Sequence, residues 1–328
     1  MTENSRHALV GAIGGTFISL ATMDIDELTV SNFALLNSAD FASPMEAIQR
    51  YLASIPRCPR MVALSVAGQV EGQTATMTHL PWSFDWNDIR AVTDADKVCF
   101  VNEFEALALA MPHMTKYELI ELGDGRIVPG GSKAVVSAGT GLGTASLFVL
   151  DGRWRAKAGA SALALLPLST ADGFDFGDLA DADGQVQAGR ILSGKGLMAV
   201  YAKLAAEGTR LNPQQITAAG LSGTDKAAQR ALELMAAWLG RFSAEIALHF
   251  GATGGLYLAG GLPTGIVEVL KRGIFRKAFE GSGERQDYLQ HVQVCALKSA
   301  ADPGLRGAAV ALANSLPKQT RSYHRLRA

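Results

Sequence analysis

Short apolar runs alternate along this chain with longer segments in which apolar residues recur at helical spacing. The short runs are rich in β-branched and bulky residues, which predicts buried strands, and the longer segments predict helices that bury one face. Strands are expected at residues 8–11, 18–21, 61–66 and 97–101, twice within 134–150, and at 255–259. Helices are expected at residues 43–54, 85–91, 105–111, 191–204, 225–250 and 308–314. Residues 76–84 are expected to form a loop.

The stretch 134–150 joins its two strands through a tight turn that contains Gly139, Thr140 and Gly141. Glycines leave backbone N–H groups accessible because no Cβ stands in the way, and the threonine hydroxyl adds a donor. Such a turn suits the binding of a phosphate group. Taken alone, the stretch is equally compatible with an ordinary hairpin turn.

The same arrangement occurs near the N-terminus, where Gly11 precedes a turn made of Gly14, Gly15 and Thr16. Gly14 and Gly139 are 125 positions apart, which is too far for a short solenoid repeat. Two such hairpins suit two domains that hold one phosphorylated ligand. Neither is a P-loop, because no Lys-Ser or Lys-Thr follows the glycines. Neither fits the dinucleotide fingerprint, because strands rather than helices follow the turns.

Two further strand ends carry candidate site residues. Gly260 and Gly261 follow the strand at 255–259 and suit close contact with a flat nucleobase or a ribose. Asn102 and Glu103 follow the strand at 97–101. Ligands in α/β sheets bind at the carboxyl ends of parallel strands, so both side chains are expected to line a site. The alternative for this pair is an N-terminal helix cap.

Composition and charge narrow the class of protein. With 328 residues, of which 48% are hydrophobic and 19% charged, the chain has the composition of a globular protein with room for two domains. The net charge of −1 gives no reason to expect nucleic acid or an acidic membrane as a partner. Three widely spaced cysteines favour free thiols in a reducing compartment, and no signal-peptide pattern is present, so a cytoplasmic protein is expected. The aspartates within 172–183 are expected in an exposed loop, and the basic residues within 318–328 in a solvated tail.

Seven segments, taken together, resemble the bacterial glucokinase family. In order they are AIGGT, MTHLPW, VNEF, AGTGLG, RILSGKGL, GRFSAEIALHFGATGGLYLAGG and DPGLRGAA, from about residue 8 to residue 313. The resemblance implies two RNase H-like α/β domains of the actin and sugar-kinase superfamily, with a ligand cleft between them. The expected domains are residues 1–112 with 305–328, and residues 113–304. It also implies transfer of a phosphoryl group from Mg-ATP to the 6-hydroxyl of glucose, usually by a homodimer.

The chain departs from this family at positions that contact sugar and metal. The aspartate that helps to place Mg²⁺ matches Ala12, and the catalytic aspartate matches Glu103, which keeps the carboxylate on a longer side chain. The glutamate and histidine that grip sugar hydroxyls match Ala160 and Leu163, and a further sugar-binding glutamate matches Gly189. Other departures lie at Phe17, Ser19 and His79.

The resemblance and the departures predict a protein that binds ATP through the three glycine turns but phosphorylates glucose weakly or not at all. Each charge-assisted hydrogen bond lost from the sugar removes about 1.5–3 kcal/mol. Three such losses match or exceed the ~5 kcal/mol of sub-millimolar sugar binding. No residue is assigned to a metal. Two alternatives stay open: a kinase for another acceptor with Glu103 as its base, and a functioning glucokinase that compensates elsewhere.

Overall fold

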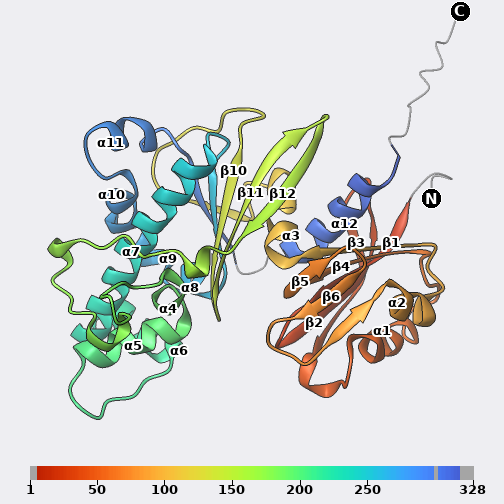
Figure 1. Cartoon of the computed structure of the whole chain (residues 1–328), viewed down its shortest axis with the longest axis horizontal. Coiled ribbons are helices and arrows are strands. Elements are labelled where there is room, and N and C mark those ends of the chain that lie inside the picture. Colours follow the sequence, from red (N-terminus) through yellow and green to blue (C-terminus); the bar gives the residue numbers. More distant parts are fainter. Residues whose placement is uncertain (1–5, 299–301, 318–328) are drawn as a thin grey trace, which may run out of the picture. The chain divides into compact units, whose positions relative to one another are not determined.

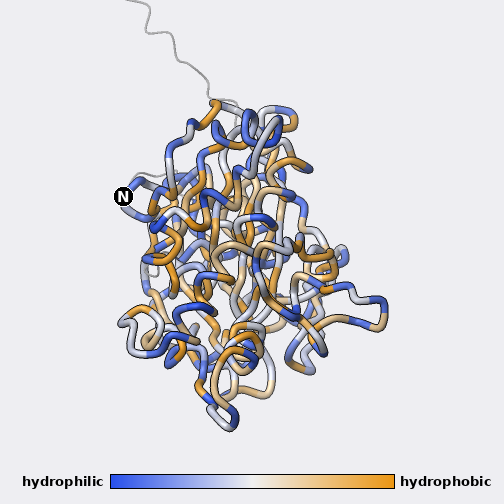
Figure 2. Tube along the Cα trace, turned by 90° about the vertical axis from the view of Figure 1, so that its left-hand side faces the viewer, coloured by the Kyte–Doolittle hydropathy of each residue, from blue (hydrophilic) through white to orange (hydrophobic). Residues whose placement is uncertain are grey.

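The computed structural model describes residues 6–298 and 302–317, which form two compact units. Unit 1 contains the residues up to Ala106 together with those from Gly304 onward, and unit 2 runs from Leu107 to Pro303. Hydrophobic residues follow the strands and the buried helix faces, whereas hydrophilic residues lie mainly in the loops (Figure 2). The predicted basic tail at 318–328 lies outside the described residues.

Unit 1 is built on a five-stranded sheet with the strand order β3-β2-β1-β4-β8 (Figure 1). The first three strands form an antiparallel meander, and the other two run parallel to β1. The strands are β1 (His7–Ile13), β2 (Phe17–Asp24), β3 (Thr29–Asn37), β4 (Met61–Val66) and β8 (Lys97–Asn102). Helices α1 (Pro44–Leu52) and α2 (Trp86–Thr93) pack on one face of this sheet, and α3 (Glu103–Ala110) and α12 (Pro303–Ser315) lie on its other side (Figure 1).

Local sequence signals explain where the helices of unit 1 begin and how closely they pack. The Ser43 hydroxyl accepts a hydrogen bond from the Glu46 amide at 3.3 Å, which confirms the predicted start of α1. Asp85 caps α2 in the same way. A Cβ at Gly307 would lie 1.8 Å from the carbonyl oxygen of Ala106, so α12 packs directly on the backbone of α3.

A small three-stranded sheet stands where a loop was expected. Its strands are β5 (Gly68–Glu71), β6 (Thr74–Met77) and β7 (Ser83–Asp85), and β6 and β7 extend into residues 76–84. The loop prediction was therefore wrong at both ends of that segment. Ala75 and Met77 are buried whereas Thr74 and Thr76 are exposed. This alternation is the strand pattern, but small and polar residues hide it in the sequence.

Unit 2 repeats the topology of unit 1 with one additional strand. Its sheet has the order β12-β11-β10-β13-β14-β9, in which β10, β11 and β12 form a meander and β13 and β14 run parallel to β10. The strands are β9 (Leu119–Glu121), β10 (Lys133–Ala138), β11 (Leu142–Leu150), β12 (Arg153–Gly159), β13 (Leu256–Ala259) and β14 (Val294–Leu297). The same order, meander first and parallel strands after it, occurs in both units. This confirms the predicted α/β fold of two RNase H-like units.

The long helix α7 (Lys226–Phe250) packs its apolar face against the sheet of unit 2 and forms the centre of its core. Around it lie α4 (Ala188–Ile191), α5 (Gly194–Leu204), α6 (Pro213–Ser222), α8 (Gly261–Gly265), α9 (Val267–Leu270), α10 (Ile274–Glu280) and α11 (Glu284–Leu289). The helix expected over 191–204 is α5, and it starts at Gly194 because Ser193 has extended backbone and caps it through the Gly196 amide at 3.1 Å. Ile191 ends the separate short helix α4.

The aspartate-rich segment 172–183 is largely the exposed loop that was expected, with Asp175, Asp178, Asp181 and Asp183 exposed, but Asp172 departs from the prediction. The Asp172 side chain is only 10% exposed, and its carboxylate accepts hydrogen bonds from Arg241 and, at 2.9 Å, from the Trp238 indole. Phe174 packs edge-to-face against Trp238 with ring centroids 5.3 Å apart, and Phe176 packs at a tilt against the same ring at 5.1 Å. This loop is therefore fastened to α7 by an ion pair and an aromatic cluster.

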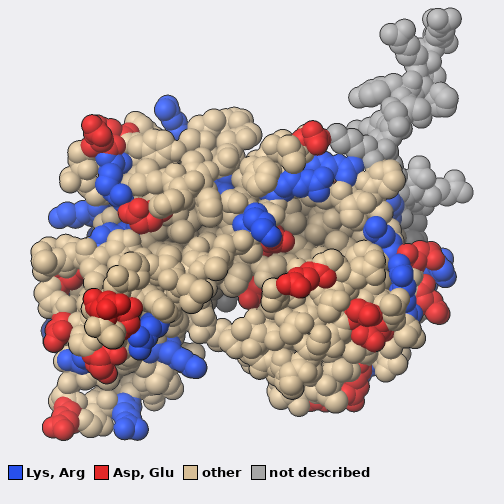
Figure 3. Space-filling model, in the orientation of Figure 1, with Lys and Arg blue, Asp and Glu red and all other residues tan. Residues whose placement is uncertain are grey.

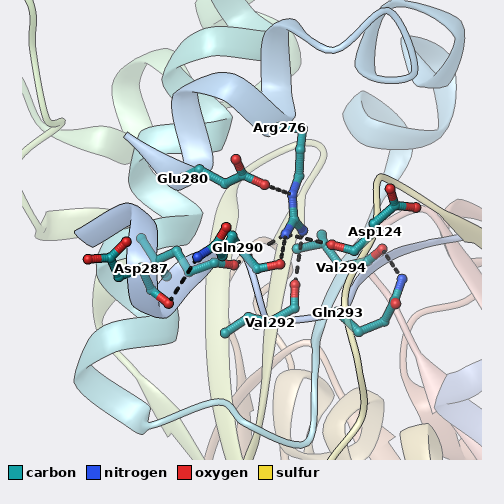
Figure 4. Close-up of polar contacts among 9 residues, drawn as sticks. Asp124, Arg276, Glu280, Asp287, Gln290, Val292, Gln293 and Val294 are labelled. Carbon is teal, nitrogen blue, oxygen red and sulfur yellow. Dashed lines mark hydrogen bonds and ion pairs between the residues drawn. The ribbon is translucent and has the colours of Figure 1, made fainter. Parts of the chain in front are cut away.

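The partly buried side chain of Arg276 links α10 to two loops of unit 2 (Figure 4). The guanidinium of Arg276 donates to the carbonyl oxygens of Val292 at 2.9 Å, Asp124 at 2.9 Å and Gln290 at 2.7 Å. It also forms an ion pair with Glu280 at 2.5 Å. Arg276 thereby ties α10 to the loop before β14 and to the loop after β9.

In the chain from 6 to 298 and from 302 to 317, no helix combines the length and the apolar character that a bilayer-spanning segment requires. Acidic and basic side chains are interspersed on the face shown in Figure 3, which agrees with the net charge of −1.

Candidate functional site

The candidate nucleotide site in unit 2 is a pocket of about 710 Å³ at the carboxyl ends of β10 and β13. Four elements enclose it: the turn between β10 and β11, the first turns of α5, the helix α6, and the helix α8. Its lining residues are Gly139, Thr140, Gly194, Lys195, Leu197, Met198, Pro213, Gln214, Thr217, Ala218, Leu221, Gly261, Leu262 and Gly265. Three of the predicted nucleotide residues, Gly139, Thr140 and Gly261, thus line one pocket.

Backbone hydrogen bonds shape the glycine turn at the pocket floor. The Gly139 amide donates to the carbonyl oxygen of Gly141 at 2.8 Å, and the Gly139 carbonyl accepts from the Gly194 amide at 2.8 Å. Among the hydrogen bonds of the described residues, none uses the amides of Thr140 and Gly141. These N–H groups and the Thr140 hydroxyl are the donors that a phosphate group requires.

Glycine is required at the neighbouring turn after β13. Gly260 has a φ of +90°, and a Cβ there would lie 2.3 Å from the carbonyl oxygen of Ala138. The ends of β10 and β13 therefore approach each other backbone to backbone, which brings Gly261 to the pocket wall. Gly141 and Gly261 have open space where a Cβ would stand.

The wall of the pocket that α5, α6 and α8 form is apolar and partly exposed. Met198 of α5 is 41% exposed although it lies among Leu197, Leu221 and Leu262. An apolar slot beside free backbone donors is complementary to a nucleoside phosphate: the base would lie between apolar side chains, and the phosphates would accept hydrogen bonds from the turn. Lys195 supplies a positive charge at the same pocket.

Sequence reasoning missed most of this wall. Helix α6 was not predicted, although Asn212 and Gln215 form a capping box across Pro213 and Gly223 ends the helix in the left-handed conformation. Those residues are the standard start and stop signals of a helix. The absence of a strong apolar stripe between residues 213 and 222 concealed them.

The first glycine turn belongs to unit 1 and joins β1 to β2. Ser38 holds it from behind, since its amide donates to the Thr16 carbonyl at 2.9 Å and its hydroxyl donates to the Gly14 carbonyl at 2.8 Å. The Gly14 amide donates to Phe17 at 3.0 Å, so Gly15 and Thr16 form the exposed tip. Gly11 lies inside β1, where a Cβ would meet Leu64 at 2.7 Å, so its place in the fold is one of packing.

Asn102 and Glu103 lie at the carboxyl end of β8, as predicted. The Asn102 side chain caps α3 by accepting from the Phe104 amide at 2.9 Å, and its NH₂ group donates to the Gly68 carbonyl at 2.8 Å. The helix-cap interpretation thus holds for Asn102. Glu103 is half-buried at the first turn of α3, and burial raises the pKa of its carboxyl to about 7. A carboxylate with that pKa suits a general base near neutral pH.

The position of the family's metal-placing aspartate holds no carboxylate. Ala12 lies in β1 directly between Ser19 of β2 and Ser65 of β4. Mg²⁺ prefers carboxylate oxygens together with water and substrate phosphates, and hydroxyl groups are a poor replacement. In the part of the chain that the structure describes, no group of three or more His, Cys, Asp or Glu side chains could hold a metal ion. This row of the sheet therefore does not fit a protein-held Mg²⁺.

The segment that matches the family's sugar-gripping loop is apolar and mostly exposed, but Ala162 within it packs closely on Gly189. Leu163 is 68% exposed, and the Ser161 hydroxyl is paired with the Thr144 hydroxyl. A Cβ at Gly189 would lie 2.8 Å from the carbonyl oxygen of Ala162 and 2.9 Å from its Cβ. Ala162 thus fills the space in which the side chain of a glutamate at position 189 would stand.

Comparisons with known proteins show similarity to glucokinases along nearly the whole chain. The family model described as Glucokinase matches residues 9–315. A glucokinase from Pectobacterium atrosepticum is 33% identical over 309 residues, which cover 92% of this chain and 95% of that protein. A glucokinase from Hahella chejuensis is 32% identical over 95% of this chain and 98% of that protein.

Solved structures give the same fold. A glucokinase from an Antarctic psychrotroph has a TM-score of 0.84 at 25% identity and covers 95% of this chain and 100% of that one. A ROK family glucokinase from Streptomyces griseus, solved in complex with glucose and AMPPNP, has a TM-score of 0.63 at 21% identity, with 92% of this chain and 98% of that chain covered.

Proposed function

This chain belongs to the glucokinase family, and from that premise we propose that it binds ATP in the pocket of unit 2 but has lost efficient phosphorylation of glucose. The reaction has two requirements that different parts of the molecule meet. One half of the reaction needs a nucleotide site, and the other half needs a site for the hydroxyl groups of the sugar.

The nucleotide half is supported by the pocket geometry. The turn at Gly139–Gly141 offers free backbone donors, Met198 and Leu221 offer an apolar wall, and Gly260 keeps the two strand ends in register. A related glucokinase from Streptomyces griseus was solved with AMPPNP, an ATP analogue. In this chain the turns with the AGTGLG and LAGG sequences are present without replacement of their glycines.

The proposed loss of glucose binding rests on one observation, the absence of space for a side chain at Gly189. In the family this position supplies a carboxylate to the sugar, whereas here a backbone carbonyl lies 2.8 Å from where even a Cβ would stand. Ala160 and Leu163 remove two more polar groups. Without these partners, the hydroxyl groups of a bound sugar would be left without hydrogen bonds. The free-energy cost of removing them from water then exceeds the binding free energy of a weak sugar complex.

A second candidate function is phosphoryl transfer to a less polar hydroxyl acceptor. Glu103 favours it, because its carboxyl has a pKa of about 7 and lies at the carboxyl end of β8. In that reaction the acceptor hydroxyl gives its proton to Glu103, its oxygen forms a bond to the γ-phosphorus, and ADP leaves with the electrons of the broken P–O bond. No step here is assigned to a protein-held metal.

A coupled assay of ADP release separates these functions. The purified protein is supplied with Mg-ATP and, in turn, with glucose, other hexoses and less polar alcohols. The proposal predicts no turnover on glucose above the ATPase background. Turnover on glucose at about 1–100 s⁻¹, the ordinary range of kinases, would refute it. Turnover on a less polar acceptor that Glu103→Gln abolishes would establish the second candidate.

A further inference from the structure

Unit 2 contains a second cavity, of about 440 Å³, that shares no lining residue with the nucleotide pocket. Tyr257 and Cys295 lie side by side on β13 and β14 and line this cavity. Their neighbours along the strands, including Leu256 and Val294, point to the core that contains α7. Because side chains alternate across a strand, the cavity lies on the face of the sheet away from α7.

Lys133 lines this cavity although it is only 7% exposed. Its ammonium group donates to the Gly254 carbonyl at 2.7 Å. The ring centroids of Trp154 and Tyr257 lie 5.5 Å and 5.6 Å from the nitrogen, which is the range of cation–π contact. These partners are all neutral.

The buried charge of Lys133 has no anionic partner. Among the described residues no carboxylate forms an ion pair with it, and burial lowers the pKa of its ammonium group. An ammonium group has three N–H donors, and one of them is used by the Gly254 carbonyl. Buried charges are costly unless an opposite charge accompanies them, so a cavity beside such a group is suited to an anion.

The remaining walls of the cavity are mostly apolar. Met111, Met114, Leu119 and Ile127 line it, and methionines adapt to ligands of irregular shape and contact aromatic rings favourably. Glu121 of β9 lies opposite Cys295 of β14, and it lines the same cavity and is exposed. The ligand that fits has one negative charge for Lys133 and an apolar body for the methionine wall.

We propose that this cavity binds a small organic monocarboxylate, with its carboxylate on Lys133 and its hydrocarbon body against Met111 and Met114. Lys116 and Glu121 also line the cavity with opposite charges, so together with Lys133 the lining carries a net charge of +1. One carboxylate balances that charge, whereas a dianionic phosphate exceeds it. The volume lies within the range of about 300–1,000 Å³ that small-molecule sites occupy. The site is independent of the nucleotide pocket and of the fate of glucose.

The probe for this site is 4-phenylbutyrate, with the neutral 4-phenylbutyramide as its isosteric control. Calorimetry on the full chain saturated with ATP is expected to show one saturable site for the acid and none for the amide. Lys133→Met should weaken binding about tenfold to a hundredfold, the range for loss of a charge-assisted hydrogen bond. Lys277→Met, which replaces an exposed lysine on α10, should leave binding unchanged.

A second variant keeps the test decisive if Lys133→Met does not fold. Glu121→Gln removes an exposed negative charge from the cavity and should tighten binding about twofold to threefold. The position of the ligand is checked through Cys295, whose modification by methyl methanethiosulfonate should slow with bound acid while that of Cys58 in unit 1 does not. Equal binding of acid and amide, no saturable binding of the acid, or an affinity indifferent to both variants would overturn the proposal.

Discussion

Gly189 offers the sharpest test of why the sugar site is closed, through the variants Gly189→Ala and Gly189→Glu. The added Cβ would stand 2.8 Å from the Ala162 carbonyl oxygen and 2.9 Å from the Ala162 Cβ, so backbone must move. Overpacking of this kind costs about 1–3 kcal/mol. The higher helix propensity of alanine returns at most about 1 kcal/mol. We therefore expect Gly189→Ala to lower the free energy of unfolding by about 1–2 kcal/mol.

Thermal unfolding followed by circular dichroism measures this loss. For a unit of about 200 residues, 1 kcal/mol corresponds to about 2–4 °C, so Tm should fall by about 2–8 °C. Gly265→Ala is the matched control, because the nearest atom to its Cβ would be 3.9 Å away and no loss is expected.

Gly189→Glu carries the functional half of the test. It restores the carboxylate that the family uses, but we expect no gain in glucose binding because the backbone of Ala162 occupies its path. If Gly189→Glu is as stable as the parent protein and binds glucose more tightly, the reasoning from packing is refuted.

Three further variants test other parts of the account. Gly260→Ala should weaken ATP binding more than tenfold in calorimetry, because the added Cβ would lie 2.3 Å from the Ala138 carbonyl oxygen and the residue would keep a φ of +90°. An unchanged affinity for ATP would count against the pocket assignment. Glu103→Gln should raise Tm at pH 8 but not at pH 4. The folded pKa of Glu103 is about 7, above the unfolded value, so its contribution to stability is present at low pH and is lost as pH rises through 7. Equal shifts of Tm at both pH values would contradict this. Arg276→Met should lower the free energy of unfolding by about 2–3 kcal/mol in urea titration, because it removes the ion pair with Glu280 and charge-assisted hydrogen bonds to the carbonyl oxygens of Val292, Asp124 and Gln290. A loss below about 1 kcal/mol would show that those bonds contribute little.

Sequence patterns predicted the parts of the fold that depend on local chemistry. The β-branched runs before and after each glycine turn became β1, β2, β10 and β11, because such residues pack well on a pleated surface. The capping serine and following proline marked the start of α1 correctly. The strands β6 and β7 were missed because threonine and serine on the exposed face made a strand pattern resemble a loop.

Features that depend on distant contacts were beyond local reasoning. Asp172 looked solvated because charged runs usually are, yet it is buried against Trp238 and Arg241, about 66–69 positions later in the chain. The apolar wall at Met198 required knowledge that α5 and α6 flank the same turn. The meaning of Gly189 likewise emerged only once Ala162 was seen to fill the space beside it.

The most direct test of the central claim is a calorimetric titration of glucose into the protein saturated with AMPPNP, after AMPPNP binding has itself been measured. The account predicts saturable binding of the nucleotide analogue and no measurable heat from glucose at concentrations up to about 1 mM, where an ordinary sugar site of ~5 kcal/mol would be largely filled. Saturable glucose binding at sub-millimolar concentration, or no binding of AMPPNP, would contradict it.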